Sequence, residues 1–100
     1  ITIPENEIIY AQADNIYAEV VTAQGIFLYS NKISLLEKEL NEAYFYRSNR
    51  SYIVNFNYII GYSKKEIEFS NGQKALISSS KFKDFKSKYL NYLKRKSIGE

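Results

Sequence analysis

Hydrophobic and polar residues alternate along most of the chain in short runs separated by turn residues, a pattern typical of an all-β domain. The runs predict strands at residues 7–11, 16–22, 26–29, 45–47, 51–54, 58–62, 66–69 and 73–78. Gln24-Gly25 and Asn71-Gly72 each divide two neighbouring runs and so predict hairpins. Asn71-Gly72 is the stronger signal, because both residues tolerate the positive φ angles of a type I′ turn.

Two segments have helical periodicity instead. In the first, Ser34 and Glu37 have the spacing of a capping box, in which two side chains bond neighbouring backbone N–H groups. Three apolar residues recur there at helical spacing: Ile33, Leu36 and Leu40. We therefore predict a short amphipathic helix over residues 34–42.

The second helical segment covers residues 80–96. Four of its apolar residues recur every three or four positions and are expected to pack on the sheet: Phe82, Phe85, Tyr89 and Leu93. Its other face is rich in Lys, with Asp84 as the only acidic residue. Ser79 and Ser80 are alternative N-caps. The whole pattern predicts one mostly β domain with two accessory helices.

Composition excludes several classes of function. The 100 residues suffice for a single globular domain, 45% of them are hydrophobic, and none is Cys or His. This excludes disulfides, thiol catalysis and cysteine-based zinc sites, and removes the commonest base at neutral pH. The paired carboxylates lie where their apolar neighbours direct them to solvent, and the four glycines are isolated. We therefore expect no enzyme activity, no cofactor and no metal site.

The ends and apolar runs of the chain bear on its location. No apolar run approaches the ~20 residues that span a bilayer, and no signal segment or initiator Met opens the sequence. We therefore expect residues 1–100 to form one cytoplasmic domain, excised from a longer protein, with no membrane partner.

Charge is distributed unevenly along the chain. Residues 1–42 contain two basic and seven acidic residues, a net charge of −5, whereas residues 43–100 have a net charge of +8. A basic half of this kind suits a polyanionic partner, although a solubilising lysine surface explains it equally well.

A cluster of Arg, Asn and Ser between two predicted strands is the most specific feature. Arg47 and Arg50 are two of only three Arg in the chain, and Asn49 lies between them. Arg can bond guanine or a phosphate through two N–H groups, and Asn can pair in a similar way with adenine. The alternative is structural: one Arg pairs with a Glu, and Asn49 and Ser51 close turns.

The cluster belongs to a longer pattern, aromatic-x-Arg-x-x-Arg-Ser-x-Ile-Val-Asn-x-x-x-Ile, which extends from Phe45 to Ile59. With this pattern the chain resembles the LytTR DNA-binding domains of bacterial response regulators. The resemblance also includes the strands over residues 8–21, the helix near 34–40 and the Asn71-Gly72 hairpin before the last helix. It covers about residues 5–93, which we take as the core of the domain.

The resemblance implies an elongated, multi-stranded antiparallel β-sandwich that inserts loops into successive major grooves of double-stranded promoter DNA. It further implies transcription regulation, an upstream receiver domain and possible homodimers on repeated sites. The residues that it places in contact with DNA are Asn15, Tyr17, Arg47, Asn49, Arg50, Ser79, Ser80 and Lys81.

These residues form three groups. In the turn at 14–17, either Asn15 or Tyr17 is the contacting residue. In the central loop, Arg50 is the best match to a base-reading position, and Arg47 is expected to hold a phosphate. In the turn before the last helix, many family members have Arg. Here either Lys81 replaces it, or Ser79 and Ser80 contact phosphates through hydroxyls and the helix N-terminus.

Two other functions share these basic and aromatic features. One is a small β-barrel that binds single-stranded nucleic acid through stacking tyrosines. We expect the tyrosines to be used mainly in core and sheet packing instead. The other is a protein-interaction module whose basic helix, residues 80–96, binds an acidic partner. Asn55, although part of the family pattern, is interpreted as structural, because an Asn amide can bridge backbone groups at a strand end.

Overall fold

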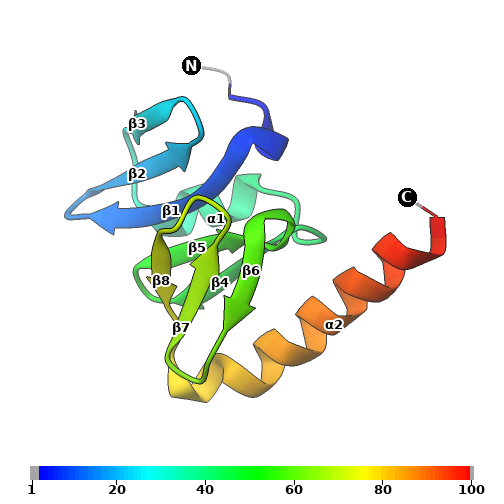
Figure 1. Cartoon of the computed structure of the whole chain (residues 1–100). Coiled ribbons are helices and arrows are strands. Elements are labelled where there is room, and N and C mark those ends of the chain that lie inside the picture. The colour runs from blue at the N-terminus through cyan, green and yellow to red at the C-terminus, as the bar shows by residue number, and fades with distance from the viewer. Residues whose placement is uncertain (1–2, 100) are drawn as a thin grey trace.

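The computed structural model describes residues 3–99, which form two antiparallel sheets and two α-helices (Figure 1). The larger sheet has the strand order β3-β2-β1-β5-β4, with β1 (Ile8–Asp14), β2 (Tyr17–Thr22), β3 (Gly25–Tyr29), β4 (Phe45–Asn49) and β5 (Tyr52–Asn55). The smaller sheet has the order β6-β7-β8, with β6 (Ile59–Tyr62), β7 (Glu66–Phe69) and β8 (Lys74–Leu76). The α-helices are α1 (Ile33–Glu39) and α2 (Phe82–Gly99), and 3-10 helices form at Glu5–Glu7, Phe56–Tyr58 and Ser79–Lys81.

The predicted fold class, mainly β with two helices, is therefore confirmed. With principal extents of 35 × 30 × 25 Å, the molecule is only slightly longer than it is wide. Neither of the α-helices in the described residues is long and apolar enough to cross a membrane.

The five-stranded sheet has a buried core on each of its faces, and a β-bulge in β1 determines which β1 residues point into each core. The pairing of β1 with β2 shifts register between Ile8 and Tyr10. Consecutive residues of a regular strand point to opposite faces, but a bulge can put two neighbours on one face. Ile9 and Tyr10 accordingly share one core, whereas Ile8 and Ala11 belong to the other.

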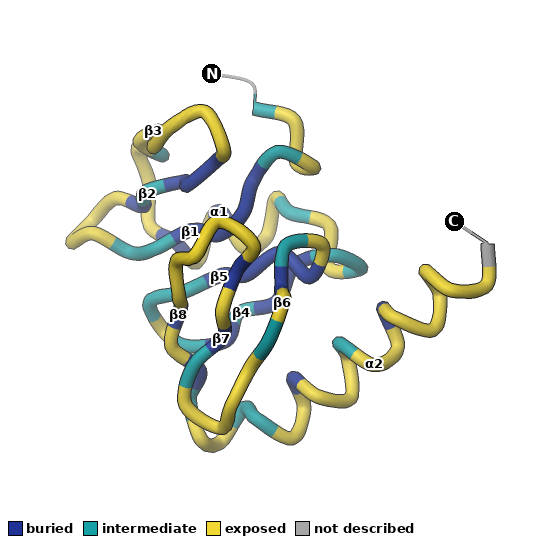
Figure 2. Tube along the Cα trace, viewed as in Figure 1, coloured by how far each residue is buried: buried dark blue, intermediate teal, exposed yellow. Residues whose placement is uncertain are grey.

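Helix α1 covers one face of the sheet, where its buried Ile33 and Leu36 pack on Ala18, Phe45 and neighbouring residues. The three-stranded sheet and α2 cover the other face. There, buried residues of β7 and β8 join Phe85 and Tyr92 of α2. Buried positions follow β1 and β5 through the middle of the molecule, whereas α2 is buried only at intervals along one side (Figure 2).

Most of the tyrosines in the predicted strands take part in this packing, as expected. Tyr46 is buried, and Tyr44, Tyr52 and Tyr58 are half-buried. Tyr62 remains 42% exposed but lies edge-on to Phe85, with ring centroids 5.3 Å apart.

The predicted helix caps are wrong. Helix α1 begins at Ile33, one residue before the predicted start, so Ser34 lies inside its first turn and Lys32 occupies the N-cap without a side-chain bond. At the other helix, Ser79 and Ser80 lie within a 3-10 helix that precedes α2. The N-cap of that 3-10 helix is Ser78, and its side chain makes no capping bond.

One core position of α2 and one turn type also differ from the prediction. Tyr92 is buried at 4% exposure, whereas Leu93 is 41% exposed. Both positions fit helical spacing after Tyr89, but the Tyr92 hydroxyl donates to Asn57 Oδ1, which favours Tyr92 as the core residue.

The predicted hairpin at residues 71–72 forms, but only Gly72 of the pair has positive φ (+87°), so the turn is not type I′. Instead, the Asn71 side chain accepts from the backbone N–H of Gln73 at 3.0 Å.

The structural role predicted for Asn55 is confirmed. Its side chain is fully buried, donates to the carbonyl of Ile8 at 2.8 Å and accepts from the N–H of Asn57 at 2.9 Å. The amide therefore joins the end of β5 to the start of β1 and closes the 3-10 turn that leads to the smaller sheet.

Candidate nucleic-acid interface

Three connections that are distant in sequence meet at one edge of the molecule, on the left in Figure 1. Strand β5 pairs with β1, and the N–H of Ala13 donates to the carbonyl of Ser51 at 2.8 Å. This places the β1–β2 turn beside the β4–β5 turn. The N–H of Ser78 donates to the carbonyl of Ser48 at 2.8 Å, which brings the β8–α2 connection to the same edge. All three groups of predicted DNA-contacting residues lie on these connections or at the strand ends beside them.

A bulge at Ser48 joins the second and third connections. The β4–β5 register shifts between Arg47 and Asn49, so Ser48 has no direct partner on β5. Its side chain is completely buried, and its hydroxyl donates to the carbonyl of Leu76 at 2.8 Å. The residue that leaves the β4–β5 ladder thus fastens the end of β8.

The Arg47 side chain bonds within the protein. Its Nε donates to the carbonyl of Asn49 at 3.0 Å, and Nη2 donates to the carbonyl of Arg50 at 2.5 Å. Its Nη1 donates to Glu37 Oε1 on α1 at 2.7 Å. The side chain is only 17% exposed, so the guanidinium faces the turn and α1 rather than solvent.

Asn49 and Arg50 differ in how far they are engaged. The Asn49 Oδ1 accepts from the N–H of Ser51 at 2.8 Å, which closes the turn in the structural manner predicted as the alternative, and its Nδ2 lies 3.4 Å from the Ser78 hydroxyl. Arg50 is exposed, and within residues 3–99 its guanidinium has no hydrogen-bond or ion-pair partner. Of the three side chains predicted here, Arg50 is the one that makes no bond to the rest of the described chain.

The β1–β2 turn presents a short exposed tip. Asp14 pairs with Tyr17, so Asn15 and Ile16 form a two-residue connection. Asn15 has φ +60°, a left-handed conformation that Asn adopts more readily than most residues. Asn15, Ile16 and Tyr17 are all exposed, so both candidates for the contacting residue are accessible.

The third connection is held against β4 through Tyr46. Its hydroxyl donates to Asp84 Oδ2 at 2.8 Å and lies 3.4 Å from the carbonyl of Lys81. Burial and the bond to Asp84 raise the pKa of Tyr46 far above its usual value, so the hydroxyl remains a donor even in alkaline solution. The Lys81 ammonium lies 5.8 Å from the centre of the Tyr46 ring, while Ser79 and Ser80 are exposed.

Comparison with known protein families shows which family this chain belongs to. The sequence profile described as the LytTr DNA-binding domain matches residues 1–90. The chain therefore belongs to the LytTr DNA-binding domain family. This confirms the resemblance noted in the sequence, and it assigns the domain a family role in DNA binding.

Solved structures support the same fold. The LytTr DNA-binding domain of a protein described as a methyl-accepting/DNA response regulator from Bacillus cereus is 23% identical, with a TM-score of 0.76. The similarity covers 90% of this chain and 86% of that one. The comparison with curated proteins found no match.

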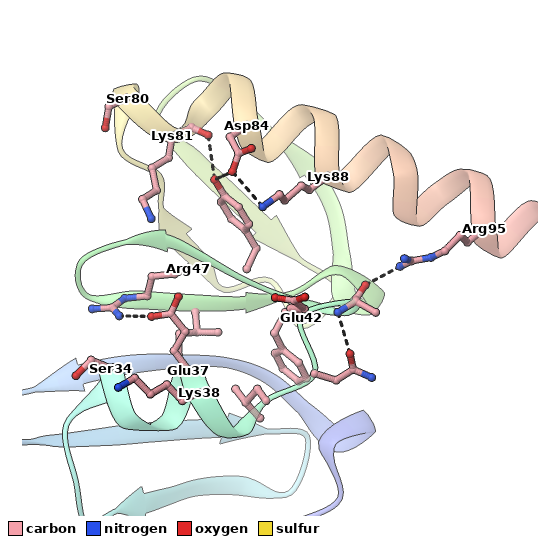
Figure 3. Close-up of a pocket in the computed structure, with 16 residues that line it drawn as sticks. Ser34, Glu37, Lys38, Glu42, Arg47, Ser80, Lys81, Asp84, Lys88 and Arg95 are labelled. Carbon is pink, nitrogen blue, oxygen red and sulfur yellow. Dashed lines mark hydrogen bonds and ion pairs between the residues drawn. The ribbon is translucent and has the colours of Figure 1, made fainter.

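A groove of about 1220 Å³ separates α2 of this LytTr domain from α1 and β4 (Figure 3). Its charged lining residues are Lys38, Arg47, Lys81, Lys88, Arg95, Glu37, Glu42 and Asp84. Two ion pairs neutralise part of this charge: Arg47–Glu37, and Lys88–Asp84 at 3.6 Å. Ser80, Lys81 and Arg47 lie toward one end of the groove and Arg95 toward the other, so the groove extends from the loop edge along α2.

The sequence analysis missed two lysines beside the LytTr loop edge. The N–H of Ile77 donates to the carbonyl of Lys65 at 2.9 Å, so the β6–β7 turn lies next to the third connection. Lys64 and Lys65 in this turn are both exposed. The Lys-Lys pair was visible in the sequence, but only the pairing of β7 with β8 and the bond to Ile77 bring it to this edge.

Proposed function

We propose that this LytTr domain binds specific sites in double-stranded promoter DNA and so regulates bacterial transcription. The observation that carries the proposal is the gathering of three exposed, sequence-distant connections at one edge of a domain of this family. The major groove, about 12 Å wide, admits a two-stranded β-ribbon, so the β1–β2 and β4–β5 hairpins can enter it without a recognition helix.

Arg50 is assigned the base-reading role. Its exposed guanidinium has no partner among the described residues, so it loses no internal bond on binding DNA. A guanidinium can donate two parallel hydrogen bonds to guanine O6 and N7, which identifies that base in the major groove. Asn49 flanks it and retains one free amide hydrogen for a second contact.

Lys81, Ser79 and Ser80 are assigned to DNA phosphates at the third connection. Lys64 and Lys65 in the adjacent turn add positive charge there. Contacts of this kind to phosphates position the protein on DNA, whereas contacts to base edges read the sequence. In the first connection, Asn15 and Tyr17 remain alternative contacts, because both are exposed beside the same two-residue turn.

The larger setting follows from the family and from the function of the related protein. We propose that the domain is the output domain of a cytoplasmic response regulator with a receiver domain upstream, and that two copies bind repeated sites. Duplexes with one or two copies of a selected site distinguish single from paired binding, because a second site raises the apparent affinity only when two copies cooperate.

Arg50→Ala is expected to reduce affinity for a selected site by about 1–3 kcal/mol, or roughly 5- to 150-fold, and to relax the base preference at one position. The measurement is the dissociation constant for the selected duplex and for single-base variants of it. An equal loss on selected and random duplex would mean that Arg50 contacts a phosphate and reads no base.

Lys81→Ala is expected to weaken binding to selected and random duplexes alike. Because one phosphate contact is lost, the slope of log K against log salt should become shallower by about one unit. Lys94→Ala is the control: it also removes one positive charge, from an exposed position of α2 that is 13 residues beyond Lys81, or about 20 Å along the helix axis. Equal slopes for Lys81→Ala and Lys94→Ala would remove Lys81 from the interface.

A further inference from the structure

The Arg47 guanidinium uses each of its three nitrogens in a bond inside the protein. Two nitrogens donate to the carbonyls of Asn49 and Arg50, and the third donates to Glu37. The two carbonyls belong to consecutive residues, the last of β4 and the first of the β4–β5 turn. One planar side chain therefore fixes the orientation of two successive peptide groups in the turn.

This arrangement depends on the shape of Arg as well as on its charge. The guanidinium presents its N–H groups in a rigid, planar fork, and each bond to it is strengthened by the positive charge. A Lys ammonium carries the same charge but is a single point on a flexible stem. A Lys at this position can contact Glu37 or one carbonyl of the turn, but it cannot reproduce the planar contact with the two carbonyls.

Glu37 connects this fork to the body of the domain. It is a residue of α1, whose neighbouring Leu36 is buried against the five-stranded sheet. The Glu37 carboxylate therefore has a well-fixed base, although its own side chain is 46% exposed. Held at one end by α1 and at the other by the turn, Arg47 lies between them with little freedom.

We propose that Arg47 is a positioning residue: with Glu37, it holds the β4–β5 turn in the one conformation that presents Arg50 to DNA. This inference rests on the proposed function and replaces the phosphate contact expected from the sequence. Three of the five N–H groups of Arg47 are bonded inside the protein and its side chain is only 17% exposed, so little of the guanidinium is available to a phosphate. Arg47 accordingly determines how well the site discriminates between sequences, while it adds little to the attraction for DNA in general.

Arg47→Lys separates the two roles, because it keeps the charge and removes the fork. Positioning predicts that preference for the selected over the random duplex falls about tenfold, near the lower end of the range for Arg50→Ala, with an unchanged salt slope. A phosphate contact predicts that Lys retains the preference. An unaltered preference in Arg47→Lys, or a slope shallower by about one unit in Arg47→Ala, overturns the proposal.

Glu37→Gln tests the other end of the contact, with opposite signs for the two roles. If Arg47 contacts phosphate, removal of its carboxylate partner frees the guanidinium and strengthens binding to the selected site. If Arg47 positions the turn, the same change weakens binding to the selected site relative to the random duplex. Glu42→Gln is the matched control, because Glu42 is exposed and lines the same groove but makes no bond to Arg47.

A measurement without DNA keeps the inference separate from the proposed function. Amide hydrogen exchange over residues 49–52 should be faster in Arg47→Lys than in the unmodified chain, with exchange in β7 and α2 unchanged. Unchanged exchange over 49–52 overturns the positioning role. If the unmodified chain does not distinguish selected from random duplex, the proposed function fails, whereas the exchange result still decides whether Arg47 holds the turn.

Discussion

Phe85→Ala is expected to destabilise the domain by about 3–5 kcal/mol, the usual cost of removing a buried Phe side chain from a packed core. Phe85 is completely buried and has its ring centroid within 6.2 Å of four other aromatic rings, those of Tyr46, Phe56, Tyr62 and Tyr89. Domains of this size have a total stability of about 5–15 kcal/mol, so the loss is a large fraction of it. Thermal unfolding should shift downward by on the order of 15–30 °C.

Leu90→Ala provides the comparison on the same helix. Leu90 is 52% exposed, and an exposed substitution of this kind is expected to change the stability by about 0.5 kcal/mol or less. Urea unfolding of both variants measures the difference. If Phe85→Ala costs no more than Leu90→Ala, then α2 does not pack on the sheets through Phe85 as the structure has it.

Asn55→Ala is the second large effect, with an expected cost of about 2–4 kcal/mol. The substitution removes the partner of the Ile8 carbonyl at a buried bond and that of the Asn57 N–H at a part-buried one, and an unsatisfied buried group costs about 1–3 kcal/mol. The free energy of unfolding from urea titrations measures the loss. Asn55 contacts the start of β1, whereas the proposed DNA-contacting turn lies at the other end of that strand. We therefore expect the folded fraction of this variant to bind DNA with unchanged specificity.

Asn71→Ala is the matched control for Asn55→Ala. Asn71 also accepts a backbone N–H two residues ahead, at 3.0 Å, but it lies exposed in the hairpin loop. Water can replace that bond, so the expected loss is about 1 kcal/mol or less. Similar losses in the two variants would contradict the assignment of Asn55 as a buried bridge between strands.

The sequence was sufficient to predict the elements whose pattern is local. The strict alternation at residues 66–69 and the Asn71-Gly72 pair identified the β7–β8 hairpin. The helical spacing at Phe82 and Phe85 identified α2. Family resemblance added the antiparallel architecture that these local patterns lack, and both the family profile and the solved relative support it.

What could not be predicted depends on contacts between distant segments. Tyr92 and Leu93 fit helical spacing equally well, and only the position of Asn57 and the Phe56 ring selects Tyr92 for the core. The capping box at Ser34 failed because α1 begins one residue earlier, where the burial of Ile33 fixes its start.

The candidate site shows the same division. The family resemblance gave Arg50 a base-reading role and Arg47 a phosphate contact, but nothing in the sequence indicates that the Arg47 side chain is bonded to the turn. The difference arises from Glu37, which α1 places beside Arg47 from ten residues away. Likewise, Lys64 and Lys65 become neighbours of the third connection only through the fold.

The most direct test of sequence-specific duplex binding is fluorescence anisotropy with three labelled DNAs: duplex with sites selected by this chain, random duplex and the matched single strand. Titrations across ~50–200 mM salt separate specific from electrostatic binding. We predict a preference for the selected duplex of at least about 10³-fold that persists as salt rises. Equal binding to all three DNAs that salt abolishes, or a preference for the single strand, would contradict the proposed function.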